Sequence, residues 1–504
     1  MKGLIFSLGM ITSLWCSAQT NGLGIFESQV DVGKPKLAGS ANFDAQDQHY
    51  DLSGGGYNIW FNRDEFHYVY KKVKGDFILS GQFALLGTGV DPHRKTGWMV
   101  RASDQEDAAH MTATVHGDGL TVLQWRRLRG AYMRDPQDEL FAPKKAAQII
   151  ELERSGKTFI MRVANPGEPL QEIGRTSEVD MPDEVLVGVF VCSHNPEVVE
   201  KARAWNLRIT KPAPEGYNAY RQGRLFSRLE IMDLATLNRK VIHVDSVGFE
   251  APNWMPGGQK LLFNHEGSIY TIPISGGVPE KLNTGIADRN NNDHVISKDG
   301  KWLGISHHRS NMPGGGSTVY YLPIGGGDPV MVTDSTPSYL HSWSPDGKDV
   351  IYTAQRLSQS PAYNIYKKPV KGGPEVRLTQ NDRGLADGPE YSPDGKYIYY
   401  NANLTGTMQV WRMKSDGKDP EQITFDEYNN WFPHISPDGK WIVIISFPPD
   451  IDPGDHPFYK HVMLRLMPAS GGAPRVIAHL YGGQGTINTP SWSPDSKYLA
   501  FVSN

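Results

Sequence analysis

One short phrase recurs six times in the second half of the chain and constrains the fold more than any other feature. In its fullest form the phrase reads Ser-Pro-Asp-Gly, and a Lys and a short apolar run follow it. The copies are spaced 42, 47, 48, 44 and 57 residues apart and begin at Met255, Ser297, Ser344, Ser392, Ser436 and Ser493. Repeats of about 40–45 residues are typical of β-propellers whose blades have four strands.

The residue types in this phrase indicate a tight turn between two strands rather than a set of catalytic acids. Proline presets φ at the first turn position, aspartate bonds back to the local backbone, and glycine accepts positive φ. A second hairpin follows each of the first five phrases, and one unmatched hairpin lies upstream at 228–244. We therefore expect a six-bladed propeller over 223–504, closed by pairing of 228–244 with the last blade, which removes free sheet edges.

The first part of the chain has a different pattern. Residues 20–211 contain short alternating strand segments with Gly and Asp-Gly between many of them, which favours one jelly roll or β-sandwich. The 53 glycines and 35 prolines of the chain agree with many short strands and tight turns. The segment 212–222 is the expected linker. The predicted fold is therefore all-β, an N-terminal jelly-roll or β-sandwich followed by a six-bladed β-propeller.

Residues 1–18 have the layout of a secretory signal peptide. Lys2 precedes an apolar run at 4–14, and small residues follow at 16–18. We expect a periplasmic or secreted protein; anchoring through Cys16 is disfavoured because the bulky Trp15 precedes it. No other apolar run is long enough to span a membrane.

Charge and cysteine content exclude two further classes of protein. Lys and Arg are scattered and the formal net charge is −4, so no nucleic-acid partner is expected. Two cysteines cannot form a disulfide scaffold. We expect a monomer.

The repeats resemble the TolB-like, or PD40, propeller family. The specific matches are Trp343-Ser344-Pro345-Asp346-Gly347 and Trp492-Ser493-Pro494-Asp495, each followed by a short strand. The resemblance implies a six-bladed propeller but says little about function, because the family includes translocation-associated proteins, peptidase propellers and sugar-acid lyases.

The N-terminal region looks like the concanavalin-like sandwiches found beside bacterial carbohydrate enzymes. Residues 75–83, 97–103 and 110–119 carry this likeness. It implies a sugar-binding concave face, for which the candidates are Trp98, Arg101, His110, His116, Gln124, Trp125, Arg126 and Tyr132. The alternative is that the aromatic residues form the core and the charged residues lie on solvated faces.

Polar residues recur in the strand that precedes each turn phrase, where a propeller lines its central channel. His294 and His341 lie three residues before their serines, and Glu390 and His434 lie two before. Imidazoles and carboxylates at similar blade heights favour a divalent metal site for Mn, Zn or Ca. Its expected ligands are His294, His341, His434, Glu390 and Gln484; the alternative is that these histidines cap strand ends and bond neighbouring blades.

Two further groups of residues are candidates for binding and catalysis. The expected substrate contacts are Asn292, Tyr339, Arg356, Asn430 and Trp431. An insertion at 447–461 carries His456, Lys460 and His461, which could act as general base or substrate contact if this loop folds over the channel. Proline-rich turn packing is the alternative for the loop.

These observations lead to two hypotheses. In the first, the exported protein binds an oligo- or polysaccharide at the channel mouth and processes it as a metal-assisted lyase or as a hydrolase. The strand 431–438 is similar to the histidine-containing strand of oligogalacturonate lyases, although it holds one histidine rather than two. In the second, the propeller is a non-catalytic TolB-like scaffold that docks periplasmic protein partners. The chain contains no G-x-S-x-G or H-E-x-x-H motif.

Overall fold

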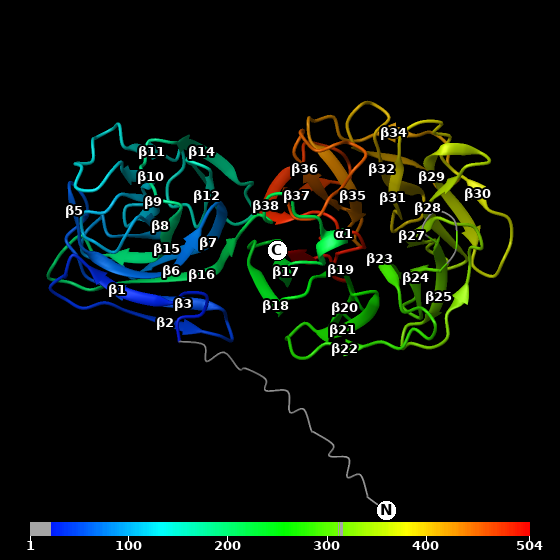
Figure 1. The fold of residues 1–504 in the computed structure, drawn as a ribbon, viewed down its shortest axis with the longest axis horizontal. Helices are drawn as coiled ribbons and strands as arrows, with labels where there is room; N and C mark the ends of the chain where they lie inside the picture. The colour runs from blue at the N-terminus through cyan, green and yellow to red at the C-terminus, as the bar shows by residue number, and fades with distance from the viewer. Residues whose placement is uncertain (1–21, 311, 313–315) are drawn as a thin grey trace, which may run out of the picture.

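The chain folds into two β-rich regions that lie side by side (Figure 1). The computed structural model describes residues 22–310, 312 and 316–504, so the expected signal peptide at 1–18 lies outside the described residues. Strands dominate, and the one helix among the described residues is the single turn α1 (Ala219–Gln222) between the two regions. The all-β class is confirmed. In the described part of the chain, no helix has the length and apolar character that crossing a membrane requires.

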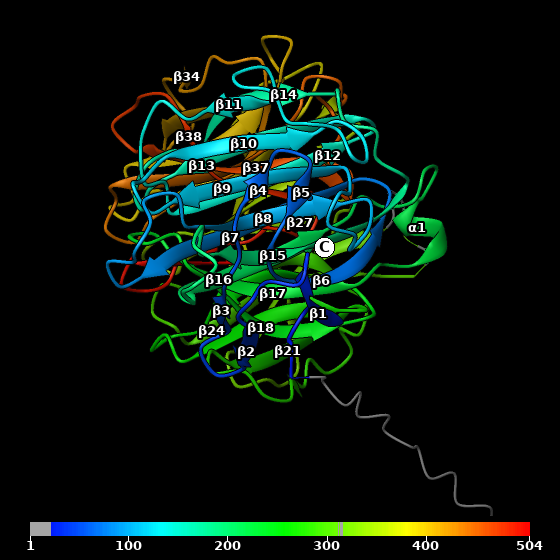
Figure 2. The same ribbon diagram turned by 90° about the vertical axis from the view of Figure 1, so that its left-hand side faces the viewer.

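The N-terminal region is a sandwich of two seven-stranded antiparallel sheets (Figure 2). The first sheet has the order β1 (Ser28–Val32), β6 (Phe66–Lys74), β15 (Glu184–Cys192), β8 (Lys95–Arg101), β9 (His110–His116), β10 (Thr121–Arg126) and β11 (Glu139–Phe141). The second has the order β14 (Gln171–Thr176), β13 (Thr158–Ala164), β12 (Ile149–Ser155), β7 (Phe77–Leu86), β16 (Glu200–Thr210), β3 (His49–Gly54) and β2 (Ser40–Asp44). The strands β4 (Ile59–Trp60) and β5 (Arg63–Asp64) form a separate small hairpin. The concanavalin-like assignment stays a prediction.

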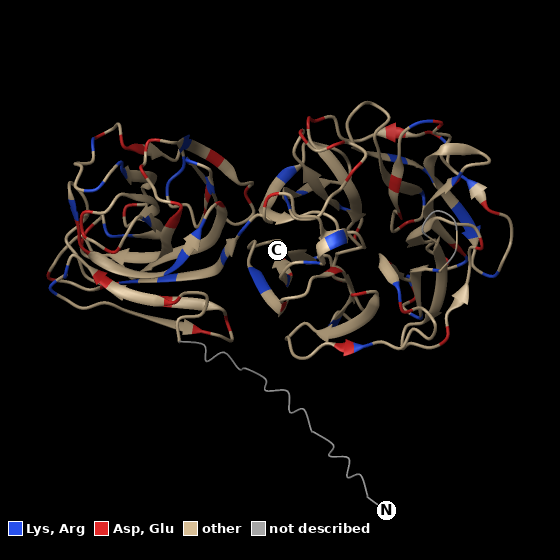
Figure 3. Cartoon of the chain, viewed as in Figure 1, with Lys and Arg blue, Asp and Glu red and all other residues tan. Residues whose placement is uncertain are grey.

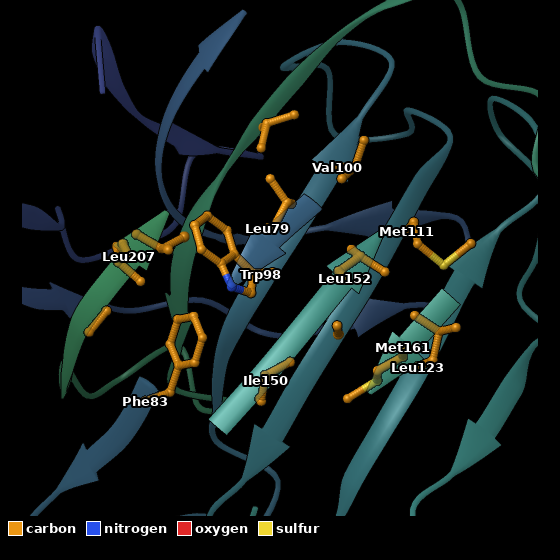
Figure 4. Packing of buried hydrophobic residues seen from close by; sticks show 14 of the residues in the cluster. Leu79, Phe83, Trp98, Val100, Met111, Leu123, Ile150, Leu152, Met161 and Leu207 are labelled. Carbon is orange, nitrogen blue, oxygen red and sulfur yellow. The ribbon is translucent and has the colours of Figure 1, made fainter. Parts of the chain in front are cut away.

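The apolar core of the sandwich lies between its two sheets (Figure 4). Trp98 and Val100 of β8 face it from the first sheet, and Leu79 of β7 with Ile150 and Leu152 of β12 face it from the second. Successive side chains of a strand point to opposite faces, so each of these strands gives every second residue to the core. Full burial of such a side chain contributes about 1.5–3 kcal/mol.

The opposite face of the first sheet holds a buried ion cluster. Arg101 and Arg126 both bind Asp64, with Nη1 atoms 2.8 and 2.7 Å from Oδ2, and His110 lies 4.0 Å away. All four side chains are closed off from solvent. Burial raises the pKa of Asp64, but Arg101, His110 and Arg126 outweigh it, and the pKa lies below its usual value. This corrects our expectation for the sandwich, because three candidate sugar contacts form this cluster.

Two more of those candidates lie in the core. Trp98 and Trp125 are buried between the sheets, whereas Tyr132 is exposed.

The second region is a propeller of six sheets arranged in a ring (Figure 1). Blade 1 is β19 (Phe249–Trp254), β20 (Lys260–His265), β21 (Ser268–Pro273) and β22 (Glu280–Lys281); blade 2 is β23 (Asn290–Ile296), β24 (Trp302–His308), β25 (Ser317–Pro323) and β26 (Val330–Met331). Blade 3 is β27 (Ser338–Trp343), β28 (Asp349–Arg356), β29 (Ser360–Pro369) and β30 (Val376–Arg377); blade 4 is β31 (Ala386–Tyr391), β32 (Tyr397–Ala402), β33 (Gln409–Lys414) and β34 (Glu421–Gln422). Blade 5 is β35 (Asn429–Ile435), β36 (Trp441–Phe447), β37 (Lys460–Pro468) and β38 (Arg475–Gly482), and blade 6 joins β39 (Tyr498–Ser503) to β17 (Ser227–Asp233) and β18 (Arg239–Asp245).

The repeated phrase forms the turn between the first two strands of a blade. In blade 3, Asp346 Oδ1 accepts from Ser344 Oγ at 2.7 Å and from the backbone N–H of Lys348 at 3.2 Å. Gly347 adopts φ 69°, a conformation that glycine takes without steric cost. These contacts use the aspartate as a turn former.

A buried charge cluster joins the two ends of the ring to the sandwich. β17 pairs with β39, so the hairpin at 228–244 closes the propeller. On β17, Glu230 accepts from Ser503 of β39 at 2.5 Å, from Arg208 of the sandwich at 2.9 Å and from Arg239 at 2.6 Å. Burial raises the pKa of Glu230, but the two guanidinium groups outweigh it and lower the pKa to about 2.

The first strand of each four-stranded blade is irregular at mid-length. Register shifts interrupt its pairing in all five of these blades. The shift lies at the same distance from the turn phrase in β19, β31 and β35, and at other distances in β23 and β27. The bulges of β19, β31 and β35 place Ala251, Gly388 and Phe432 at positive φ. A bulge re-aims the side chains beside it, and these bulges lie where the strands line the channel.

Candidate ligand site at the propeller mouth

The propeller channel opens at one end into a cavity of about 790 Å³. The first strands of blades 1 to 5 supply its wall, together with the segment that follows β38. Most lining side chains are polar or aromatic: Tyr220, Arg224, Glu250, Asn290, Asn291, Asn292, Asp293, His308, Tyr339, His341, Thr353, Tyr363, Asp387, Asn403, Phe432, His456, Phe458, Gln484 and Asn488. A cavity of this size suits a small-molecule or oligomeric ligand.

Two segments that are far apart in the sequence meet at this cavity. The linker carries α1, whose Tyr220 ring lies 5.5 Å from the Phe458 ring of the blade 5 insertion. The Arg224 guanidinium lies 5.4 Å from the centroid of the same ring, and the N–H of Leu225 donates to Tyr459 Oη at 2.7 Å. The insertion therefore folds against the mouth, and the linker binds it there.

An imidazole and two carboxylates occupy the centre of the wall. His341 Nε2 lies 3.1 Å from Asp387 Oδ1. Burial lowers the pKa of His341, but the nearby Asp293 and Asp387 outweigh it and raise the pKa above its usual value. Burial raises the pKa of Asp387, but the charge and hydrogen bond of His341 outweigh this effect, and the pKa lies well below the usual range. These shifts favour the protonated form of His341 and the ionised form of Asp387.

Asp293 has the opposite character to Asp387. Burial raises the pKa of Asp293 to about 7; His341 opposes the shift and the charge of Asp387 adds to it. Its Oδ2 accepts from Asn291 Nδ2 at 2.6 Å. Two carboxyl groups whose environments separate their pKa values provide one proton donor and one charged acceptor in the same cavity.

A second ion pair and a group of rings complete the wall. Arg224 binds the buried Glu250 at 2.7 Å, and burial raises the pKa of that carboxyl group. The His456 ring lies 4.4 Å from Trp431 and 5.3 Å from Phe432. Burial lowers the pKa of His456, which keeps the imidazole neutral near pH 7.

Comparisons with known proteins agree with this architecture. Residues 342–449 match the TolB beta propeller domain family. An uncharacterized protein of Agrobacterium fabrum is 43% identical over 281 residues, which cover 56% of this chain and 93% of the relative. This chain belongs to the TolB-like propeller family.

A solved structure supports the same assignment. A structure described as "putative TolB from Agrobacterium tumefaciens" is 43% identical, with a TM-score of 0.52, and the match covers 56% of this chain and 99% of that one. An oligogalacturonate lyase in complex with manganese also aligns, with 13% identity and a TM-score of 0.39 over 55% of this chain and 82% of that chain. A likeness at this low identity and TM-score indicates nothing about the function of this chain.

Five residues that we predicted from the sequence line the mouth of this TolB-like propeller. They are Asn292, Tyr339, His341, His456 and Gln484. Trp431 is fully buried and lies directly against the His456 ring, so it supports the wall without lining it.

The structure does not bring the three predicted metal-binding imidazoles together. His341 lines the mouth, whereas His294 is buried against the backbone of Ala251 and Leu262 in blade 1. His434 Nδ1 lies 2.6 Å from Glu390 Oε2, and its Nε2 lies 2.5 Å from the Ile487 carbonyl oxygen. His434 thus matches the alternative interpretation, in which it joins neighbouring blades, whereas His294 only packs against blade 1. A divalent cation at the mouth stays a prediction.

Four other candidates lie away from the mouth. Arg356 binds Glu375 through two nitrogens at 2.9 and 2.7 Å, and Asn430 bonds within blade 5 to Asp426 and Ser446. Lys460 begins β37 and is exposed. His461 lies 3.2 Å from His479 and 3.6 Å from Glu153 of the sandwich. None of the four is among the lining residues of the cavity.

Sequence reasoning missed the two central carboxylates. Asp293 and Asp387 lie in the same polar strand segments as His294 and Glu390, the two residues that the sequence predicts as metal ligands. The signal was present, since Asp293 lies within the bulge of β23 and Asp387 directly precedes the bulge of β31. Arg224 and Phe458 gave no such signal, because they come from the linker and the insertion.

Proposed function

We propose that this protein binds an oligosaccharide at the propeller mouth and acts on it by acid–base chemistry. The observation that supports this proposal is one cavity in which aromatic rings, amides and two carboxyl groups of different pKa converge. Convergent polar groups in a largely preformed concave site are the usual basis for assigning a ligand site.

The lining chemistry fits a sugar. Tyr339, Tyr363, Phe432 and Phe458 contribute rings to the cavity, and the C–H face of a sugar ring packs well on an aromatic surface. The amide groups of Asn292 and Gln484 can both donate and accept hydrogen bonds, as vicinal hydroxyl groups require. The same wall therefore offers apolar contact and directional hydrogen bonds.

The carboxyl pair provides the acid–base function. Asp293, with a pKa of about 7, holds a proton that it can donate to a leaving oxygen, and the ionised Asp387 can accept one. His341 lies against Asp387 and keeps it charged. This division of roles between two carboxyl groups is what glycosidic-bond cleavage uses, by hydrolysis or by elimination from a sugar acid.

The proposal includes export from the cytoplasm. It rests on the signal-peptide pattern at 1–18. An exported carbohydrate-binding protein meets polysaccharides outside the cell membrane.

A panel of neutral and anionic oligosaccharides tests the proposal. Binding is measured by calorimetry and products by mass spectrometry, for the wild type, Asp387→Asn and Asp293→Asn. We expect both variants to lose turnover by about 100-fold or more, because each removes one partner of the proton transfer. The control is Asp346→Asn, a turn residue outside the cavity, which should keep wild-type activity.

The outcomes also separate the alternative function. If the wild type binds no member of the panel, the carbohydrate proposal fails. Capture of one protein partner by the wild type, abolished by Tyr220→Ala or Phe458→Ala at the mouth, would instead support a TolB-like scaffold. Binding without turnover would retain the carbohydrate site and overturn the acid–base step.

A further inference from the structure

A cluster of three histidines lies at one rim of the sandwich, away from the propeller mouth. His116 ends β9, His93 precedes β8, and His194 follows the end of β15. Lys95 at the start of β8 pairs with His116 on one side and with Cys192 on the other. The strand order therefore brings together three residues that are scattered in the sequence.

The spacing of the rings matches imidazoles that share one ion. The His93 ring centroid lies 5.9 Å from that of His116 and 5.3 Å from that of His194. Two imidazoles bound to one tetrahedral ion, each through a bond of about 2.0–2.1 Å, have ring centroids roughly 5 Å apart. Both centroid distances are within about 1 Å of that value, and because the ligand atoms of the three residues do not all lie within 4.8 Å of one another, ligation requires the exposed His93 to rotate.

His116 is a buried polar group whose hydrogen-bonding capacity is unused. Its residue is 4% exposed, and neither ring nitrogen has a hydrogen-bond partner among the described atoms. Both ring nitrogens are therefore available to an ion, and neutral imidazole is the form that binds a metal.

His194 is oriented by a carboxylate. Its Nδ1 lies 3.2 Å from Asp91 Oδ1, so Nε2 is the nitrogen left to act as a ligand. A metal-binding histidine commonly donates its other ring N–H to a carboxylate, which fixes the tautomer and the ring orientation. His194 also adopts φ 60°, an uncommon backbone conformation for a residue other than glycine.

We propose that His93, His116 and His194 bind one transition-metal ion of the zinc, nickel or copper class, with Asp91 as a positioning residue. His93 is exposed, so its side chain can rotate onto an ion without breaking buried contacts, and it leaves a path for entry. Imidazole suits these metals. The nearby Lys95 ammonium group opposes a cation, and its Nζ donates to Asn58 Oδ1 at 3.2 Å.

A second group of residues provides a control. Within the described part of the chain, Asp44, Asp47 and His49 are the one set of three potential ligands whose atoms lie within 4.8 Å of one another. The two aspartates are exposed, and nothing else at this site indicates a ligand. Removing His49 therefore tests whether metal binds there instead.

The experiment measures Zn²⁺ binding to the full chain by calorimetry after treatment with a chelator. We expect one ion per chain in the wild type. Loss of an outer partner of a ligand typically weakens metal binding by about 10–100-fold, so His93→Ala should weaken it by at least about tenfold and Asp91→Asn by about tenfold. His93 is exposed, so its alanine variant should fold normally, whereas His49→Ala should bind like the wild type.

Three results would overturn the inference. One is absence of Zn²⁺ binding by the wild type, and another is equal affinity in the wild type and His93→Ala. The third is loss of binding in His49→Ala alone, which would place the ion on the other cluster. Thermal melting with Zn²⁺ against chelator gives a second reading, because an ion that binds the folded state raises its Tm.

Discussion

Blades 2 and 3 carry a histidine at the same place in the repeat, yet the two side chains have opposite surroundings. His294 and His341 each lie three residues before the serine of the turn phrase. His294 is fully buried, and burial lowers its pKa to about 4. His341 lines the mouth, and the carboxylates of Asp293 and Asp387 raise its pKa against the effect of burial. Equal position in a repeat does not ensure an equal role.

The position of the bulge explains the difference. In β23 the register shift lies between Asn290 and His294, so His294 is already past the irregular segment and pairs with Ile305. In β27 the shift lies between Leu340 and Ser342, so His341 is itself the bulged residue. A shift of one residue moves a side chain to the other face of a strand. The bulge, rather than the repeat, decides which residue reaches the channel.

The largest effect is expected at blade 5, where His434 also lies past the bulge. His434→Ala removes a side chain that joins Glu390 of blade 4 to the Ile487 carbonyl. Loss of one partner of a buried pair costs about 3–5 kcal/mol, so the free energy of unfolding should fall by that amount. Urea denaturation measures it. A loss below about 1 kcal/mol would contradict the structural role, and the double variant with Glu390→Gln should recover part of the stability.

The next effect is a pH dependence that His294 creates. Its folded pKa of about 4 lies below the unfolded value of about 6.5, so the unfolded state takes up the proton first. This stability is complete above about pH 6.5 and is lost as pH falls toward 4, by roughly 3 kcal/mol. His294→Leu should not show this loss. The check is the difference in unfolding free energy between wild type and variant across pH 4–7; parallel curves would refute it.

The opposite sign is expected for His341, with a smaller size. Its folded pKa is raised, so its contribution is complete below the unfolded value of about 6.5 and is lost as pH rises through the folded pKa. The stability difference between wild type and His341→Gln should therefore shrink with increasing pH, as measured by urea denaturation on the alkaline side of pH 6. A difference that grows with pH would show that the two blades do not differ as described.

The smallest effect is expected where the two blades are alike. Asp299 and Asp346 make the same turn contacts, each accepting from a serine hydroxyl at 2.6 and 2.7 Å and from a lysine N–H at 3.1 and 3.2 Å. Asp299→Ala and Asp346→Ala should lower Tm slightly and equally. Unequal losses in a thermal melt would mean that the repeats diverge at the turns as well.

The turns and the blades were predictable from sequence because their signal is local. The Ser-Pro-Asp-Gly phrase carries its own hydrogen-bond partners within six residues, so each copy reports a turn wherever it occurs. The closing hairpin at 228–244 followed from counting unmatched hairpins.

The roles of single side chains were less predictable, because they depend on distant partners. The sequence predicts Arg356 as a sugar contact. In the structure its guanidinium binds Glu375, which directly precedes β30 in the same blade. The sequence predicts Arg101 and Arg126 as part of a binding face. In the structure both side chains are buried and bind Asp64, which lies on the β4–β5 hairpin. The position of a bulge depends in the same way on the pairing strand, and no local motif marks it.

The pairing of β17 with β39 also determines how early the propeller ring can close during folding. The hydrogen bond between Glu230 and Ser503 joins residues 273 positions apart. At a synthesis rate of about 5–20 residues per second, β39 is made roughly 14–55 s after β17. During that interval one edge of β17 is unpaired, and Glu230 lacks its hydrogen bond from Ser503. The ring therefore closes late, and any factor that shields a strand edge in that interval acts before the channel exists.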